Sequence, residues 1–211
     1  MQSSTIYLLR HGDCRADSVR RYIGQTDLPL NGTGRDQAAW WQERLAAIRW
    51  ERIVCSDLSR SLETARIIAA GSGQLIEPLA QLREIALGDW DGLSMAELCQ
   101  TSPVAFAERG ADIAYHRPPG GESFADLARR VVPCLEELIT GASGNLLLVG
   151  HAGVNRVYLC HLLGLPLGNL MLLPQDYGGL TILELVQGRL RLRSLNILPQ
   201  PAGNITKSRS I

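Results

Sequence analysis

The stretch Ile6-Tyr7-Leu8-Leu9-Arg10-His11-Gly12 is an apolar run that stops at a charged turn. A short run of this kind is typical of a central strand covered on both faces, and the glycine after it suits a tight turn. Far downstream, Leu146-Leu147-Leu148-Val149 leads in the same way into Gly150-His151-Ala152-Gly153. Each run therefore predicts a buried strand that places one histidine at its carboxyl end.

Further strands and helices are predicted around these two runs. Apolar or β-branched residues mark strands at 52–55 and 180–185, and apolar residues recur at helical spacing over 35–48 and over 59–71, the second ending at a glycine. Strand, helix, strand order implies parallel pairing through right-handed crossovers. We therefore expect an α/β three-layer sandwich, with a mostly parallel central sheet flanked by helices and a C-terminal hairpin around 187–188.

The segment from about 84 to 144 has a different pattern. A capping box is expected at 94–97, Ser123 begins another helix, and a Pro/Gly-rich loop lies between them at 118–121. Pro133 falls inside the second helix, where it removes a backbone hydrogen bond, so we expect a kink or a break there. The segment predicts a helical cover inserted over the active edge of the sheet.

Length and composition favour one α/β domain over 1–198, followed by a polar, Pro/Gly-broken C-terminal tail at 199–211. The chain has 211 residues, of which 45% are hydrophobic and 20% charged, and its formal net charge is zero. A neutral chain has no overall field that would recruit nucleic acid or an anionic membrane, so any affinity for phosphate must be local. No signal peptide or long apolar span is visible, which favours a cytoplasmic protein.

The cysteines do not suggest a disulfide framework or a metal site. There are five, widely spaced, with no Cys-x-x-Cys pair and no His-Glu-x-x-His motif. We expect reduced thiols and no metal. Cys14 follows Arg10 and His11 closely, so it is either a reactive thiol in a positive field or a buried, inert one.

The chemistry of the two histidines points to phosphoryl transfer. A neutral imidazole is a competent nucleophile toward phosphorus, and a guanidinium such as that of Arg10 can hold two phosphoryl oxygens. Arg60 follows the strand at 52–55 and opens a helix, where an anion is favoured. Two arginines and His151 converging near His11 could neutralise a phosphate dianion and its transition state. These residues predict an enzyme that works through a phosphohistidine.

Four ordered motifs resemble the histidine phosphatase (phosphoglycerate mutase-like) superfamily, from about Ile6 to Asn196. They are Leu9-Arg10-His11-Gly12, Ser56-Asp57-Leu58-Ser59-Arg60 with Thr64-Ala65, Leu82-Arg83-Glu84-Ile85 with Gly88-Asp89-Trp90-Asp91-Gly92, and Gly150-His151-Ala152-Gly153. The resemblance implies that His11 is the phosphorylated nucleophile and that Glu84 is the proton donor. It also implies that Arg10, Arg60, His151 and Ala152 bind the phosphate, and that neither a cofactor nor a metal is needed.

Glu84 has a chemical reason to be the acid. An alkoxide leaves slowly unless it is protonated, and the same carboxylate could later deprotonate the water that hydrolyses the phosphohistidine. A salt bridge to Arg83 or to another nearby arginine is the structural alternative for this side chain. Asp89 and Asp91 are the rival acids, and Asp91 stands where the family more often has Glu.

Three residues are candidates for contacts with the rest of the substrate. Gln25 lies in a stretch that resembles the loop rimming the site in the family, with a plain turn as the alternative. His116 and Arg117 lie on the predicted cover and either touch the substrate or are solvated. His161, on an apolar helical stretch, is expected to be structural.

Several functions remain open at this point. The short cover, with Arg109, His116 and Arg117 as its main cations, favours hydrolysis over mutase activity. The loop at 118–123 and the compact length resemble the α-ribazole phosphatase branch, which predicts a small-molecule phosphomonoester as substrate. The alternatives are a phosphoglycerate mutase, a sugar bisphosphate phosphatase, and a non-catalytic phospho-ligand binding protein. A homodimer is compatible with the sequence.

Overall fold

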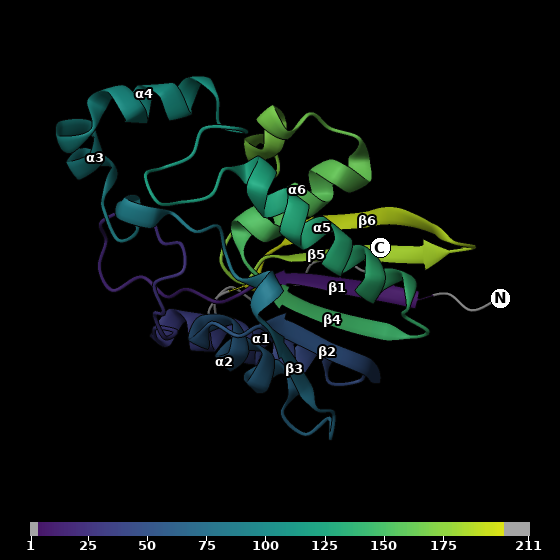
Figure 1. Ribbon diagram of the computed structural model, residues 1–211. Coiled ribbons are helices and arrows are strands. Elements are labelled where there is room, and N and C mark those ends of the chain that lie inside the picture. The colour runs from purple at the N-terminus through teal and green to yellow at the C-terminus, as the bar shows by residue number, and fades with distance from the viewer. Residues whose placement is uncertain (1–3, 201–211) are drawn as a thin grey trace.

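A six-stranded sheet forms the centre of the computed structural model, which describes residues 4–200 (Figure 1). Its strands are β1 (Ser4–Arg10), β2 (Trp50–Ser56), β3 (Ile76–Leu79), β4 (Asn145–Gly150), β5 (Leu180–Val186) and β6 (Arg189–Ile197). They are ordered β3-β2-β4-β1-β5-β6. The first four strands of this order are mutually parallel, and β5 pairs antiparallel with both β1 and β6, so the expected mostly parallel sheet with a C-terminal hairpin is confirmed.

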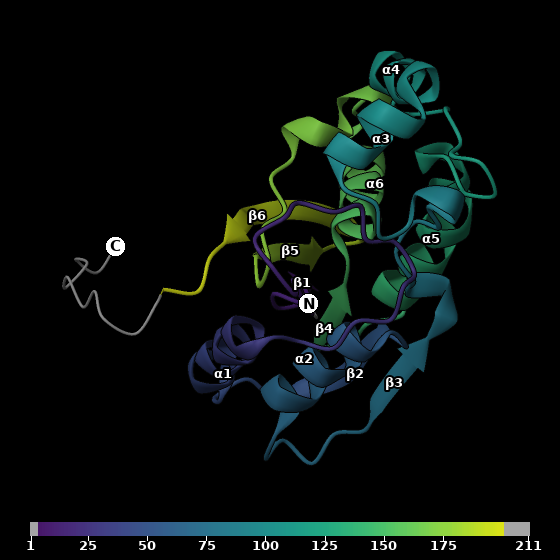
Figure 2. The same ribbon diagram turned by 90° about the vertical axis from the view of Figure 1, so that its left-hand side faces the viewer.

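Helices cover both faces of this sheet, which confirms the three-layer α/β class. Figure 2 shows α1 and α2 on one side, and α5 and α6 on the other. The α-helices are α1 (Gly32–Leu45), α2 (Ser59–Ala69), α3 (Met95–Thr101), α4 (Pro103–Ala111), α5 (Phe124–Thr140) and α6 (Ala152–Leu163). Short 3₁₀ turns lie at Ala80–Leu82, Gly88–Trp90 and Leu167–Leu172.

The core has two halves because successive side chains of a strand point to opposite faces. In β4, Leu146 and Leu148 pack into the half covered by α5 and α6, whereas Leu147 and Val149 pack with α1 and α2. All four are at most 1% exposed. The continuous apolar runs of the central strands therefore reflect burial on both faces, as expected for parallel strands under two helical layers.

Two elements differ from the sequence-based expectation. The edge strand β3 escapes recognition because it has only four residues and includes Pro78, whose missing N–H suits an edge strand. Of the kink or break expected at Pro133, the break is wrong, because α5 continues through it from Phe124 to Thr140. Buried side chains on both sides of Pro133, Val131 and Leu135 among them, anchor the helix on the core and offset the lost hydrogen bond.

The segment between β3 and β4 places α3 and α4 beyond the carboxyl ends of the parallel strands, at upper left in Figure 1. Both predicted caps are present: Ser94 with Glu97 begins α3, and Ser123 with Asp126 begins α5. Most of the predicted tail lies outside the described residues. Within residues 4–200, no helix is both long enough and apolar enough to cross a membrane.

Candidate active site

The pairing of β1 with β4 brings His11 and His151 together. Arg10 and Gly150 are register partners at the ends of these parallel strands, and the His11 N–H donates to the Gly150 carbonyl oxygen at 3.0 Å. His151 is the N-cap residue of α6. As a result the two imidazole rings meet edge to face, with centroids 5.0 Å apart. Carboxyl ends of adjacent strands are where open α/β sheets bind ligands.

The hydrogen bonds of the His11 ring define its tautomer. Its Nδ1 lies 2.7 Å from the Gly12 carbonyl oxygen, which can only accept, so Nδ1 carries the proton and Nε2 has the free electron pair. Burial lowers the pKa of His11 well below its ordinary value, and the charges of Arg60 and Arg10 lower it further. The ring is therefore neutral at physiological pH, which a nucleophile requires.

Arg60 lies directly against the free nitrogen of His11. It is 1% exposed, and its Nε donates to His11 Nε2 at 3.2 Å. Its Nη1 and Nη2 donate to the carbonyl oxygens of Thr26 and Gly24 at 2.8 and 2.6 Å. These bonds fix the guanidinium plane, so that its charge acts at the point where a phosphoryl group on Nε2 would lie.

Arg10 is held by residues of the loop before β5. Its Nη1 donates to the Gln175 carbonyl oxygen at 2.7 Å, and its guanidinium carbon stacks 3.6 Å from the centre of the Tyr177 ring. Burial lowers the pKa of Arg10, although charges such as those of Tyr177 and Glu84 partly oppose this. The buried Nε has no hydrogen-bond partner among residues 4–200. It is a donor held ready for an anion.

His151 is the most isolated polar group of the site. It is 0% exposed, and neither ring nitrogen has a partner within residues 4–200. Burial lowers the pKa of His151 well below the ordinary value, and the neighbouring His11 and Arg60 add to the effect. Buried polar atoms without partners are uncommon and often mark a functional site. Ala152, which follows, lines the adjoining cleft.

Glu84 is held next to the start of α6. Its Oε2 accepts the Gly153 N–H at 3.0 Å, and its Oε1 accepts the N–H of Ile85 at 3.0 Å. The expected alternative, a salt bridge to Arg83, is absent among the described residues, since Arg83 pairs with Asp57. Glu84 thus stays available to a ligand while its carboxylate is oriented by two backbone donors.

The rival acids have other positions. The two carboxylate oxygens of Asp91 accept the N–H groups of Gly24 and Thr26, each at 2.9 Å. Asp91 therefore supports the loop that in turn binds Arg60. Asp89 is exposed in the 3₁₀ turn. This arrangement favours Glu84 as the acid, and the assignment stays a prediction.

The three candidates for substrate contacts are placed differently. Gln25 Nε2 donates to the Glu84 carbonyl oxygen at 3.0 Å, so it lies beside the acid. Arg117 pairs with Asp126 at the start of α5, and His116 lies near Trp90, with ring centroids 6.1 Å apart. Neither His116 nor Arg117 lines the cleft described next. Their predicted role in substrate contact remains untested.

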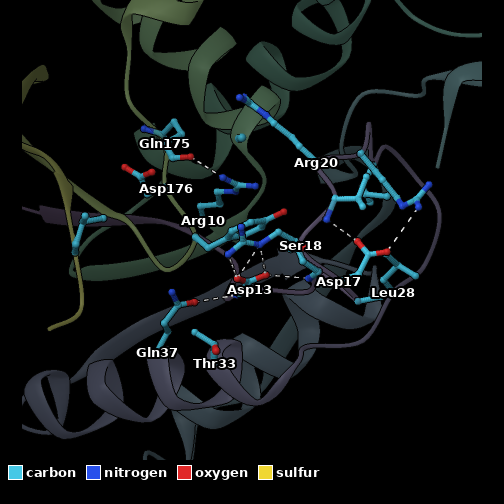
Figure 3. Close-up of a pocket in the computed structure, with 18 of the residues that line it drawn as sticks. Arg10, Asp13, Asp17, Ser18, Arg20, Leu28, Thr33, Gln37, Gln175 and Asp176 are labelled. Carbon is cyan, nitrogen blue, oxygen red and sulfur yellow. Dashed lines mark hydrogen bonds and ion pairs between the residues drawn. The ribbon is translucent and has the colours of Figure 1, made fainter. Parts of the chain in front are cut away.

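A cleft of about 790 Å³ opens beside the two histidines (Figure 3). Arg10, Ala152 and Tyr177 line it, and the Tyr177 ring centroid is 5.5 Å from that of His11. The rest of its wall comes from the segment after His11, from α1, from α6 and from residues 174–177 before β5. His11, Arg60, Glu84 and His151 are not among its lining residues, so the cleft adjoins the histidine pair through Arg10, Ala152 and Tyr177.

Sequence reasoning missed several residues of this site. Tyr177 and Gln175 come from a loop without periodicity, and Arg156 lies on α6 downstream of His151, so no motif marks them. Thr64 belongs to a recognised motif, yet only the structure shows its hydroxyl accepting the Gly12 N–H at 3.1 Å and donating to Arg60 O at 2.7 Å. This hydroxyl ties the nucleophile's turn to the arginine.

The Cys14 thiol is buried, and the charges of Arg60 and Arg10 act on it. Burial raises the pKa of the Cys14 thiol more than Arg60 and Arg10 lower it, which favours the inert alternative. Within residues 4–200, no group of three or more His, Cys, Asp or Glu side chains is placed to hold a metal ion. The positive charge of the site comes from its arginines.

Comparison with known proteins gives a consistent family. The model of the histidine phosphatase superfamily (branch 1) matches residues 6–198. Glucosyl-3-phosphoglycerate phosphatase of Mycolicibacterium vanbaalenii is 39% identical over 178 residues, covering 80% of this chain and 78% of that protein. Adenosylcobalamin/alpha-ribazole phosphatase of Salmonella typhimurium is 29% identical over 192 residues, covering 90% and 95%. The crystal structure of the alpha-ribazole phosphatase from Shigella flexneri superposes with a TM-score of 0.85 at 26% identity, covering 92% of this chain and 96% of that one.

Proposed function

Because this chain belongs to the histidine phosphatase superfamily and is similar to phosphatases of that family, we propose that it hydrolyses a small-molecule phosphomonoester. The reaction proceeds through a phosphohistidine on His11 and needs no metal ion. The observation that supports this most is the state of His11. Its Nδ1 proton is bound to the Gly12 carbonyl oxygen, and its Nε2 faces Arg60. A neutral ring with its lone pair turned toward an arginine is suited to attack phosphorus.

In the first step, His11 Nε2 forms a bond to phosphorus as the ester P–O bond breaks in line with it. Arg10, Arg60 and His151 surround the phosphoryl oxygens and stabilise the charge that they carry in the transition state. The departing alkoxide takes a proton from Glu84. Substrate oxygens replace His11 Nε2 as the partner of the Arg60 Nε–H, so that the lone pair becomes free to react.

In the second step, water attacks the phosphohistidine and the P–N bond breaks. Glu84, now ionised, takes a proton from that water, which restores both the acid and the neutral imidazole and releases inorganic phosphate. The carboxylate is oriented for both roles by the backbone N–H groups of Gly153 and Ile85. One carboxyl group thus completes the cycle.

The cover supports hydrolysis rather than phosphoryl transfer to a second substrate. Its cations are occupied within residues 84–144: Arg109 is 4% exposed and lies over the rings of Trp90 and Phe124, and Arg117 is paired with Asp126. A mutase has to hold a second anionic acceptor under this cover. Water needs no such residues.

A substrate panel in EDTA tests the proposed function. It contains p-nitrophenyl phosphate, α-ribazole 5'-phosphate, glucosyl-3-phosphoglycerate, fructose bisphosphates, and 3-phosphoglycerate with a bisphosphoglycerate primer. We expect release of inorganic phosphate, with one ester preferred by orders of magnitude in kcat/KM. Conversion of 3-phosphoglycerate to 2-phosphoglycerate without phosphate release would instead identify a mutase. Tight binding of an ester without turnover would identify a phospho-ligand binding protein.

Cytoplasmic location, homodimer formation and the lack of a nucleic-acid or membrane partner stay predictions. The proposed chemistry needs none of them, because all of the groups that it uses come from one chain.

A further inference from the structure

The lining of the cleft beside the histidines combines several arginines with three aspartates, Asp13, Asp17 and Asp176. Five arginines line the cleft: Arg10, Arg15, Arg20, Arg21 and Arg156. Arg15 pairs with Asp13, and Arg21 pairs with Asp17 and Glu97. Arg10 belongs to the phosphate site described above. This leaves Arg20 and Arg156, neither of which forms an ion pair with a carboxylate of the described chain.

Arg156 is held rigidly at the wall of this cleft. Its Nε donates to the Leu173 carbonyl oxygen at 2.9 Å, and the side chain is only partly exposed. Burial lowers the pKa of Arg156, and the charge of Arg10 lowers it further, while Glu84 and Asp176 act in the opposite direction. Keeping a half-buried cation without a paired carboxylate has a free-energy cost, which a bound anion would remove.

Arg20 completes the arrangement from the other side. It is exposed on the segment after His11, and Figure 3 shows its side chain extending over the cleft. Arg20 and Arg156 line the same cleft, one from the segment after His11 and the other from α6. The carboxylate that could compete for them, Asp176, accepts a hydrogen bond from Asn196 Nδ2 at 2.7 Å.

We propose that Arg156, assisted by Arg20, binds a carboxylate of the substrate, so that the physiological ester carries an acid group beside its phosphate. This inference rests on the proposed function. With Nε bound to Leu173, the two terminal nitrogens of Arg156 remain, and their parallel N–H groups match the two oxygens of a carboxylate. A substrate whose non-phosphate part is neutral would leave both arginines unpaired.

One matched pair of esters tests this directly. 3-Phosphoglycerate and glycerol 3-phosphate have the same primary phosphate and differ only in a carboxylate against a hydroxymethyl group. Because a hydrogen bond to a charged group contributes about 1.5–3 kcal/mol, the parent enzyme should prefer 3-phosphoglycerate by roughly 10- to 100-fold in kcat/KM. Equal values for the two esters, or a higher value for α-ribazole 5'-phosphate, would overturn the proposal.

Variants of the arginines then show which side chain causes the preference for 3-phosphoglycerate. Arg156→Gln should remove the difference in kcat/KM between 3-phosphoglycerate and glycerol 3-phosphate, Arg156→Lys should keep part of that difference, and Arg20→Gln should reduce it. Arg21→Gln is the matched control, since this arginine lines the same cleft and is already paired. A loss by Arg156→Gln that is equal for both esters would mean that Arg156 supports the phosphate site or the fold.

Binding separates this inference from the proposed function. In the His11→Ala variant, which cannot form a phosphohistidine, titration calorimetry should still show tighter binding of 3-phosphoglycerate than of glycerol 3-phosphate. If that difference is seen but no ester is hydrolysed by the parent enzyme, the hydrolytic function is wrong and the carboxylate site stands. If the parent enzyme hydrolyses p-nitrophenyl phosphate but the variant binds 3-phosphoglycerate and glycerol 3-phosphate equally tightly, the hydrolytic function stands and the carboxylate site is wrong. If Arg156→Gln does not fold, the proposal is still tested by the measurements on the parent enzyme, on Arg20→Gln and on His11→Ala.

Discussion

Glu84 and Gly153 are in direct contact: the Gly153 N–H donates to Glu84 Oε2 at 3.0 Å, and a Cβ atom at position 153 would overlap Oε1. The contact joins the loop after β3 to the first turn of α6, whose N-cap is His151. It therefore fixes the acid relative to the histidine pair, and it requires a residue without a side chain.

Gly153→Ala should disturb this contact. The added methyl group has to push the Glu84 carboxylate away, so we expect kcat on an alkyl phosphate to fall by about 10-fold or more, with roughly 1–3 kcal/mol lost from the free energy of unfolding through overpacking. Steady-state kinetics and urea unfolding measure the two effects. Gly110→Ala is the control, because nothing lies within 4 Å of a Cβ there. Full activity of Gly153→Ala would mean that the position of Glu84 is not critical.

His11→Ala should abolish turnover and leave the fold intact, because the residue lines a polar site rather than the apolar core. In the parent enzyme, rapid quench should trap a phosphate that is labile to acid and stable to base. His161→Ala is the control, since that side chain is 52% exposed and lies near Glu136. Label found on serine or cysteine would contradict the phosphohistidine mechanism.

EDTA should leave the activity unchanged. In the proposed mechanism, Arg10 and Arg60 provide the positive charge that a divalent ion provides in other phosphatases, and the neutral His151 contributes a hydrogen bond. The measurement is kcat/KM before and after dialysis against the chelator. Strict dependence on added magnesium or zinc would refute this.

Glu84→Gln should slow the release of an alcohol far more than the release of p-nitrophenol, because nitrophenolate departs without a proton. The expected loss on an alkyl ester is on the order of 10²- to 10⁴-fold, the usual range for general acid–base catalysis. The burst of alcohol release isolates this step from dephosphorylation, where the same carboxylate acts again. Asp89→Asn serves as the exposed control. Equal burst losses for both esters would leave Glu84 with a positioning role only.

Low pH should destabilise the protein through its two buried histidines. The pKa values of His11 and His151 are well below the ordinary 6.5 in the folded state. Below pH 6.5 the unfolded chain therefore binds protons that the folded chain does not, so stability falls as pH falls toward the folded-state values. Each histidine contributes about 1.4 kcal/mol per pH unit within that window.

Urea unfolding between pH 7.5 and 5.5 measures this slope, and His151→Gln should reduce it by about half the histidine contribution, since one of the two groups is removed. The acid limb of kcat/KM for the parent enzyme should also lie below pH 6.5, where His11 becomes protonated. A stability independent of pH over this range would show that the two rings are not neutral.

The sequence by itself determined the two central strands and the residues that are proposed to react at their ends. Ile6–Leu9 and Leu146–Val149 are apolar throughout because both faces of β1 and β4 are covered, and this local pattern needs no tertiary information. The same holds for the caps at Ser94 and Ser123, whose hydrogen bonds lie within one turn. His11, Arg10 and His151 could be named because each directly follows, or ends, a recognisable strand.

Only the tertiary structure decided what surrounds these groups. The continuation of α5 through Pro133 depends on packing against the core, which local propensity does not contain. Arg109, Arg117 and Arg156 are equivalent as sequence letters, yet the first lies over aromatic rings, the second pairs with Asp126, and the third faces the cleft. Charges act over distances in space, which the sequence does not contain. Loops without periodicity, such as 174–177, carry no signal of which residues they will approach. The substrate side of the site is therefore defined only when the chain is folded.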